Sequence, residues 1–253
     1  MLKYENVTLS CDRTLIIENV SVEFPEHAIT TVIGPNGSGK TTLLQALNGA
    51  TTVNSGKIYL DDMDYLALPP RQRAQHLSFL PQVRSTMPSI PVKTLVEHGR
   101  FPYLGFSRKM SSEDRKIVDQ ALTLADVKEY SSQSVDTLSG GVRQRVFLAM
   151  QLAQDCSYLV ADEPTTFLDL PSQKKILSIY SELRDAGKTI ILVLHDLTQA
   201  LQISDNIVLV DNQSVIATGS PNELIHTGII EKVFNLKLKQ FEDEDGKYIV
   251  AKA

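Results

Sequence analysis

The chain has 253 residues, of which 42% are hydrophobic, and a formal net charge of -5 at pH 7. This length can bury one α/β domain with an inserted subdomain, and the acidic balance without a Lys/Arg run argues against nucleic acid as a partner. Two cysteines, Cys11 and Cys156, exclude a disulfide framework and favour a reducing compartment. We expect no signal peptide and no membrane-spanning segment, since no apolar stretch approaches the roughly 18 residues that a span needs.

The first elements predicted along the chain are strands. Residues 7–24 are rich in β-branched side chains and predict short strands, broken near Cys11. Residues 29–33 predict a compact strand that ends at Gly34. Residues 41–48 then predict a helix with an apolar face, stopped by Gly49.

The middle of the chain reads as mainly helical. The proline-rich stretch 81–105 predicts loops with short helices, and residues 111–124 and 142–153 predict longer helices. Apolar runs at 158–161 and 190–194 predict strands buried on both faces of a parallel sheet. We therefore expect one domain over 1–253, with a core at 1–85 and 155–253 and a helical insertion at 86–154. The acidic turn after Phe241 is compatible with a hairpin or a short edge strand, but we favour a solvated tail that closes the fold.

The loop after the third predicted strand fits the pattern G-x-x-x-x-G-K-[ST]. Its glycines let successive backbone N–H groups point at one anion, at the start of a helix. Lys40 would reach the β- and γ-phosphates of a nucleotide, and Thr41 would offer its hydroxyl to Mg²⁺. A chance match to a glycine-rich turn is the alternative, but strand, loop and helix follow in the expected order. The predicted phosphate-binding residues are Gly34, Pro35, Asn36, Gly37, Ser38, Gly39, Lys40, Thr41 and Thr42.

Acidic residues follow the buried strand at 158–161. Asp162 is placed to hold Mg²⁺ through water, and Glu163 is placed to polarise an attacking water. An ordinary exposed acidic turn before Pro164 is the alternative. Ser139, Gly140 and Gly141 form a second anion-seeking turn, unless they are an ordinary helix start capped by Ser139.

Taken in this order, the motifs resemble the nucleotide-binding subunits of ATP-binding cassette (ABC) transporters over nearly the whole chain. The resemblance implies an α/β P-loop NTPase (RecA-like) core with an N-terminal antiparallel β subdomain and an inserted α-helical subdomain. It implies an ATPase that uses ATP and Mg²⁺ in a homodimer or pseudo-dimer of cassettes. Ser139 and Gly141 would then contact the γ-phosphate of ATP bound to the partner copy, and Asp169 would cross the interface. Gln82 would sense Mg²⁺ or the water, and His195 would contact the γ-phosphate.

Two positions depart from the family pattern. Cys11 stands where an aromatic residue usually stacks on adenine, which leaves Ile16 as an apolar wall and predicts weaker discrimination of adenine. Val142 stands where the family usually has glutamine, and we expect activity to survive because the anion contact is mainly made by backbone and Ser139.

The stretches 96–105 and 162–169 resemble the branch that imports iron–siderophore, haem and cobalamin complexes. This implies an integral membrane permease, an extracytoplasmic substrate-binding protein and a peripheral position at the cytoplasmic face of the cell membrane, with siderophores as the favoured cargo. His98, Arg100 and Tyr103 are expected to be surface residues that pack against a partner, since their spacing does not suit a metal. A soluble ABC ATPase in iron–sulfur cluster assembly or DNA repair is the alternative function, and an efflux subunit is a third.

Overall fold

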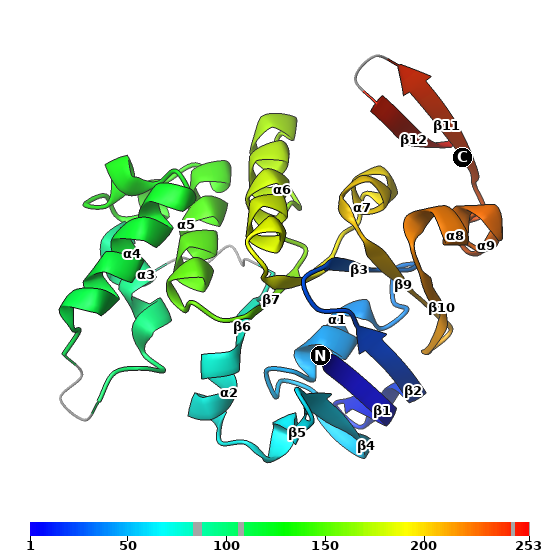
Figure 1. Ribbon diagram of the computed structural model, residues 1–253, viewed down its shortest axis with the longest axis horizontal. Coiled ribbons are helices and arrows are strands. Elements are labelled where there is room, and N and C mark those ends of the chain that lie inside the picture. The colour runs from blue at the N-terminus through cyan, green and yellow to red at the C-terminus, as the bar shows by residue number, and fades with distance from the viewer. Residues whose placement is uncertain (83–87, 106–108, 244–245, 253) are drawn as a thin grey trace. The chain divides into compact units, whose positions relative to one another are not determined.

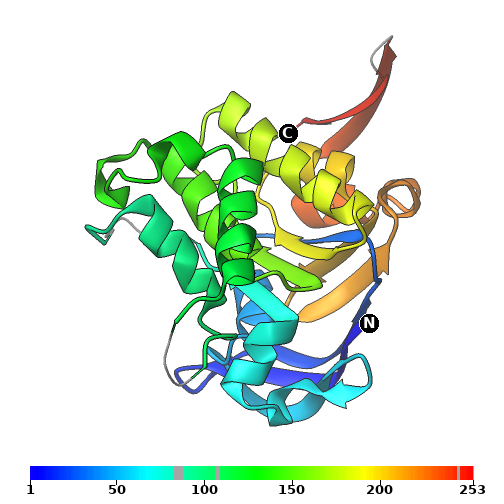
Figure 2. The same ribbon diagram turned by 60° about the vertical axis from the view of Figure 1, so that its left-hand side comes forward.

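The computed structural model describes residues 1–82, 88–105, 109–243 and 246–252. They belong to two compact units, unit 1 with Met1–Leu68 and Thr189–Ala253, and unit 2 with Pro69–Lys188. Figures 1 and 2 show the elements of each unit. The boundaries predicted near residues 85 and 155 delimit a smaller helical insertion and remain a prediction.

Unit 1 begins with an antiparallel sheet of strand order β2-β1-β4-β5. Its strands are β1 (Leu2–Cys11), β2 (Thr14–Phe24), β4 (Thr52–Leu60) and β5 (Met63–Asp64), and a 3-10 turn follows at Tyr65–Ala67. Asp12 and Arg13 join β1 to β2 with φ values of 46° and 68°, as a two-residue hairpin turn requires. The predicted break near Cys11 is therefore confirmed as a tight turn.

The second sheet of unit 1 contains β10 (Ser214–Gly219), β9 (Asn206–Asp211), β3 (Ile29–Ile33) and β8 (Thr189–Val193), in this order. Strand β3 runs parallel to β8 and β9, and every residue of β3 and β8 is buried. The apolar runs read from the sequence are thus strands covered on both faces. The helices of unit 1 are α1 (Lys40–Gln45), α7 (Leu197–Ile203), α8 (Pro221–His226) and α9 (Ile229–Phe234).

Helix α1 starts at Lys40, one residue before the predicted start, and ends at Gln45 rather than at residue 48. The Leu47 N–H bonds to Leu44 O at 3.0 Å, so the last turn tightens before Gly49. Buried Tyr4 of β1 donates its hydroxyl to Leu43 O at 2.8 Å. This bond fixes α1, and with it the preceding loop, against the antiparallel sheet.

The end of the chain is a hairpin. Strands β11 (Lys237–Asp243) and β12 (Gly246–Lys252) pair antiparallel, with Phe241 opposite Tyr248, and lie side by side in red in Figure 2. The favoured expectation of a solvated tail is wrong here, and the hairpin is right. The reason is that each β-rich segment satisfies the backbone groups of the other.

Unit 2 pairs β6 (Leu77–Leu80) with β7 (Tyr158–Asp162) in parallel and adds α2 (Pro70–His76), α3 (Val92–Glu97), α4 (Ser112–Leu124), α5 (Gly140–Ala153) and α6 (Leu170–Asp185). Short 3-10 turns lie at His98–Arg100, Lys128–Tyr130 and Val135–Thr137. Helices α3, α4 and α5, drawn in shades of green in Figure 1, share one apolar core. Ser111 and Asp114 form a capping box that starts α4. The helices predicted at 111–124 and 142–153 are therefore confirmed as α4 and α5, and α5 begins two residues earlier than predicted.

One buried glutamine connects α5, α6 and β7. Gln151 donates its amide to Val160 O at 2.8 Å and accepts the Tyr180 hydroxyl at 3.0 Å. Burial raises the pKa of Tyr180 well above its ordinary value, so this hydroxyl stays a donor. The network fixes the strand that carries Asp162.

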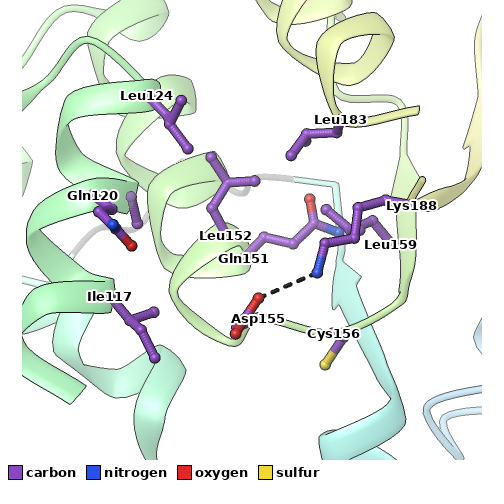
Figure 3. A pocket seen from close by; sticks show the side chains of 11 residues that line it. Ile117, Gln120, Leu124, Gln151, Leu152, Asp155, Cys156, Leu159, Leu183 and Lys188 are labelled. Carbon is purple, nitrogen blue, oxygen red and sulfur yellow. Dashed lines mark hydrogen bonds and ion pairs between the residues drawn. The ribbon is translucent and has the colours of Figure 1, made fainter. Parts of the chain in front are cut away.

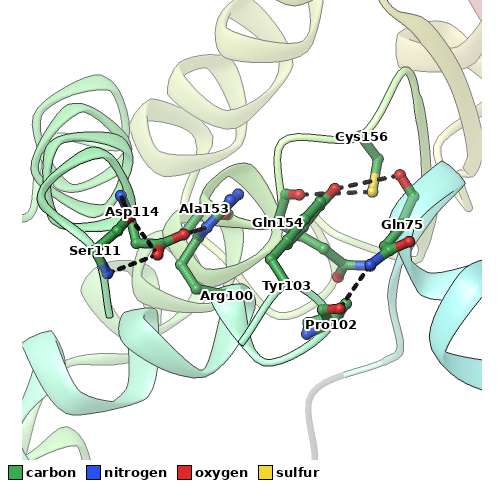
Figure 4. A network of polar contacts seen from close by, with 9 residues as sticks. All are labelled: Gln75, Arg100, Pro102, Tyr103, Ser111, Asp114, Ala153, Gln154 and Cys156. Atoms are coloured by element: carbon green, nitrogen blue, oxygen red, sulfur yellow. Dashed lines mark hydrogen bonds and ion pairs between the residues drawn. The ribbon is translucent and has the colours of Figure 1, made fainter. Parts of the chain in front are cut away.

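Arg100 is an internal residue of unit 2 rather than a surface contact (Figure 4). It is 6% exposed, pairs with Asp114 Oδ1 at 2.9 Å and donates to Ala153 O at 3.0 Å. Its guanidinium lies 4.0 Å from the Tyr103 ring centroid. The expectation of a partner contact is therefore wrong for Arg100, because the side chain finds its charge and ring partners within the unit.

Tyr103 extends this network toward α2. Its hydroxyl donates to Gln75 O at 3.2 Å, and Gln75 donates its amide to Pro102 O at 2.7 Å. Burial raises the pKa of Tyr103 to about 12 and, nearby, the pKa of the Cys156 thiol to about 12. Both groups stay protonated at neutral pH, so the segment 100–103 is held by neutral hydrogen bonds around one buried ion pair.

A pocket of about 160 Å³ also lies in unit 2 (Figure 3). Its lining is largely apolar and includes Leu124, Leu152 and Leu183. Lys188 and Asp155 at its edge form an ion pair at 3.2 Å and so neutralise each other. We assign no ligand to it.

Within the described ranges, no helix has both the length and the apolar character that a membrane span requires.

The buried ion pair predicts a specific loss of stability. Asp114→Asn leaves the Arg100 charge buried without its counterion, so we expect the free energy of unfolding to fall by about 3 kcal/mol, as for other broken buried pairs. Chemical denaturation of the full chain measures this. Asp119→Asn is the matched control on the same helix, because its pair with Lys128 is more than half exposed; it should cost at most about 0.5 kcal/mol.

The same pair predicts a pH dependence. Hydrogen bonds from Ser111 and the Arg100 guanidinium hold the pKa of Asp114 below its ordinary value of 3.8. The stabilisation that the ionised Asp114 carboxylate gives to the folded state is therefore complete above pH 3.8. It is lost as the pH falls through the lower pKa of the folded state. The stability difference between wild type and Asp114→Asn should shrink only in that acid range. A difference already lost at pH 6 would contradict the assignment.

Candidate functional site

The loop between β3 and α1 has the backbone of a phosphate-binding loop. Gly37 and Gly39 have φ values of 77° and 102°, which favour glycine. A Cβ on Gly39 would lie 2.6 Å from Ile17 Cδ1 and 3.3 Å from Ile16 Cγ2, so the loop passes directly against β2. A Cβ on Gly34 would lie 2.0 Å from Val210 O. At Gly34 a Cβ would meet backbone, so only glycine fits there; at Gly39 the buried Ile17 side chain would have to shift, and the φ of 102° already disfavours other residues.

The polar groups of the loop suit a phosphate. Lys40 is 7% exposed, and its ammonium donates to Gly34 O and Pro35 O, each at 2.9 Å. Ser38 Oγ is buried and finds no hydrogen-bond partner among the described residues. A buried hydroxyl without a partner is costly unless a ligand or water meets it. The amides at the start of α1, including those of Thr41 and Thr42, belong to the first helical turn, where anions bind.

Cys11 and Ile16 lie on the same hairpin of unit 1. Cys11 is exposed, a free thiol at the end of β1, and Ile16 is half-buried on β2 against the loop at Gly39. Ile16 can therefore offer an apolar wall beside the loop. His195 follows β8 as an exposed residue, and Asp196 next to it caps α7 by accepting from the Thr198 and Gln199 amides at 2.8 and 3.1 Å.

In unit 2, the end of β7 presents the two predicted acids. Asp162 is 2% exposed, and Glu163 follows with a φ of 55°, an uncommon conformation outside glycine. Gln82 Nε2 donates to Glu163 Oε2 at 2.6 Å. The structure thus brings together Gln82 and Glu163, which stand far apart in the sequence.

A second donor to the same carboxylate, Thr166, was not predicted from the sequence. Thr166 Oγ1 donates to Glu163 Oε2 at 3.2 Å, and the Thr166 amide donates to Glu163 O at 3.3 Å. A signal was available, since a hydroxyl residue that closes a four-residue turn can reach back to the residue that opens it.

Ser139 caps helix α5, and its hydroxyl accepts from the Val142 amide at 3.5 Å. Space is open around the Cα of Gly140, whereas a Cβ on Gly141 would lie 2.5 Å from Ser172 Oγ. Asp169 caps α6 by accepting from the Ser172 amide at 3.0 Å, which together with the hydroxyl of Ser172 lowers the pKa of Asp169. Ser139 is therefore the helix cap that the alternative interpretation of the sequence expected, and Asp169 is a cap that was not predicted.

The predicted residues fall into two groups. Unit 1 holds residues 34–42 with Cys11, Ile16 and His195, and unit 2 holds Gln82, residues 139–141, Asp162, Glu163 and Asp169. In the described part of the chain, no group of three or more His, Cys, Asp or Glu side chains could hold a metal ion. The Mg²⁺ ligands predicted from the family, Thr41, Gln82 and Asp162, remain a prediction.

The close approach at Gly39 predicts the effect of adding one methyl group. Gly39→Ala would combine a strained φ with a clash against Ile17, whereas Gly37→Ala meets nothing within 4 Å and carries the backbone strain alone, about 1–2 kcal/mol. We expect Gly39→Ala to lower the melting temperature of the nucleotide-free protein clearly more than Gly37→Ala. Equal effects in thermal unfolding would contradict the packing of β2 on the loop.

The chain is similar to known proteins over most of its length. A family model described as ABC transporter matches residues 17–166. The achromobactin transport ATP-binding protein CbrD of Dickeya dadantii (strain 3937) is 39% identical over 94% of this chain and 88% of its own length. The ferric enterobactin transport ATP-binding protein FepC of Escherichia coli (strain K12) is 36% identical over 96% of this chain and 90% of its own.

A solved structure agrees with this match. A dimeric ATP-binding cassette in a post-hydrolysis state, bound to ADP and phosphate, has a TM-score of 0.76 and 26% identity, covering 87% of this chain and 99% of the other. The P-loop fold with its antiparallel sheet and helical insertion is therefore the ABC ATPase fold. The chain belongs to the ABC transporter family, as an ATP-binding subunit whose ATPase activity is coupled to transport.

Proposed function

We propose that this chain is the ATPase subunit of an importer that takes up an iron complex, a ferric siderophore, through a separate membrane permease. The assignment of ATPase activity depends on the loop after β3. This glycine-rich loop contains the Lys40 ammonium and the buried Ser38 hydroxyl at the start of a helix. Relatives named for transport of achromobactin and of ferric enterobactin support the cargo class.

ATP binds, in this proposal, with its phosphates on residues 34–42. Lys40 exchanges its two carbonyl partners for the β- and γ-phosphates, which offer charge rather than a dipole. Ile16 contacts the base, and Cys11 borders it. Thr41, Gln82 and Asp162 would hold Mg²⁺ in this proposal, and the chemistry that the ion would supply is neutralisation of charge on the phosphate oxygens.

Two copies of the chain close head to tail around the nucleotide. Ser139, Gly140 and Gly141 of one copy supply the α5 N-terminus to the γ-phosphate bound by the other, because first-turn amides and the helix dipole favour an anion. Asp169 reaches across the interface. The dimeric, nucleotide-bound cassette among the structural neighbours supports this arrangement.

Hydrolysis then uses Glu163 and His195. The Glu163 carboxylate accepts a proton from water as the water oxygen attacks the γ-phosphorus, and the bond to the ADP oxygen breaks. His195 contacts the γ-phosphate. Closing and reopening of the dimer shift the permease between states, since ATP binds the closed state better.

Membership of the family also supports a location and a delivery partner for this chain. The chain works as a peripheral subunit at the cytoplasmic face of the cell membrane, and an extracytoplasmic substrate-binding protein delivers the cargo to the permease. Iron–sulfur cluster assembly and DNA repair, the alternatives raised from the sequence, gain no support from these import relatives.

Removing the general base should separate binding from hydrolysis. We expect Glu163→Gln to bind Mg-ATP and to form a stable dimer, with the rate of hydrolysis reduced at least about a hundredfold. Phosphate release and size-exclusion chromatography measure the two effects. Glu113→Gln is the matched control, since this glutamate is 71% exposed on α4. A normal turnover rate for Glu163→Gln would remove Glu163 from the mechanism.

The cargo is tested in cells. Deletion of the gene should abolish uptake of a ferric siderophore labelled with radioactive iron, and the wild-type gene should restore it. Glu163→Gln should not restore uptake, because hydrolysis drives the cycle. Unchanged siderophore uptake together with lost haem or cobalamin uptake would assign a different cargo to the same ATPase.

A further inference from the structure

Thr166 contacts Glu163 at both its backbone and its side chain. The amide bond to Glu163 O, at 3.3 Å, closes a turn over residues 163–166, and the hydroxyl bond to Glu163 Oε2 spans 3.2 Å. Pro164, the second residue of the turn, fixes φ there. The hydroxyl is thus held near the carboxylate by a single four-residue turn.

Hydrogen bonds also hold the rest of the loop after β7, so the Thr166 hydroxyl has a defined position. Gln173 of α6 donates its amide to Leu168 O at 3.0 Å and to Thr165 O at 3.4 Å. Asp169 caps the same helix. Glu163 itself has a φ of 55°, which costs about 1 kcal/mol for a residue with a Cβ and persists only where neighbouring contacts enforce it.

Two donors, Gln82 Nε2 and Thr166 Oγ1, bind the same oxygen of the Glu163 carboxylate, and they come from different parts of the chain. Gln82 comes from a distant segment and is also proposed to meet Mg²⁺. The Thr166 hydroxyl is three residues from Glu163 and, among the described residues, has Glu163 as its partner alone. It therefore adds a local hydrogen bond to the one that Gln82 donates from a distant segment.

We propose that Thr166 is a positioning residue for hydrolysis: its hydroxyl orients the Glu163 carboxylate toward the attacking water. This inference rests on the proposed role of Glu163 as general base. Because the hydroxyl acts through the Glu163 carboxylate, its loss should slow the chemical step and leave nucleotide binding intact.

The test compares two substitutions in the full chain. Thr166→Val removes the hydroxyl, keeps the branched shape and keeps the backbone turn; we expect kcat to fall about tenfold while KM for Mg-ATP stays within about twofold. Thr166→Ser retains the hydroxyl and should restore at least half of the wild-type kcat. Thr123→Val is the matched control on α4, where the lost hydroxyl bonds only Asp119 O, at 2.8 Å, and its kcat should be unchanged.

A double variant shows whether Thr166 acts through Glu163. In the Glu163→Gln background, single-turnover hydrolysis should not fall further when Thr166→Val is added, because coupled residues are not additive. Three results would overturn the inference: an unchanged kcat for Thr166→Val, an equal loss for Thr166→Ser, or a further tenfold loss in the double variant. Melting temperatures and Mg-ATP binding of each variant separate a folding defect from a positioning effect. A normal rate for Glu163→Gln would instead overturn the proposed role of Glu163.

Discussion

Two glycines set how closely the phosphate loop approaches the rest of unit 1. A side chain at position 39 would collide with Ile17 of β2, and one at position 34 would collide with the backbone at Val210. Because both contacts are made, the loop amides and the first turn of α1 have fixed directions before any ligand arrives. Such preorganised donors bind an anion without first reordering the chain. The nucleotide chemistry therefore depends on packing between backbone and apolar side chains.

Local contacts also fix the acidic residues at the end of β7. The strand is buried along its whole length, so the first polar residues beyond it stand where the chain turns. Glu163 begins that turn in a left-handed conformation, and hydrogen bonds from Gln82 and Thr166 fix its carboxylate. Backbone strain retained at a catalytic candidate and offset by surrounding bonds is common at active sites.

The stretch that points to iron-complex importers has an internal role in unit 2. Arg100 joins α4 through Asp114, α5 through Ala153 and the Tyr103 ring in one buried network, and Tyr103 continues it to α2. Phe101 between them remains 56% exposed. Arg100 and Tyr103, which belong to this stretch, thus hold the segment 100–103 in place within unit 2.

The sequence by itself determined the elements whose signals are local: the fully buried strands β3, β7 and β8, the capped helices α4 and α5, and the glycine pattern of the phosphate loop. Apolar runs, capping residues and glycines act over a few positions, so their effect can be read without the fold. Only the tertiary structure decided that Arg100 is buried, that residues 237–252 form a hairpin, that Gly39 contacts Ile17, and that Gln82 and Thr166 share one oxygen of Glu163. Each of these depends on which distant segments pack together or on the turn a loop adopts, and residue type alone specifies neither.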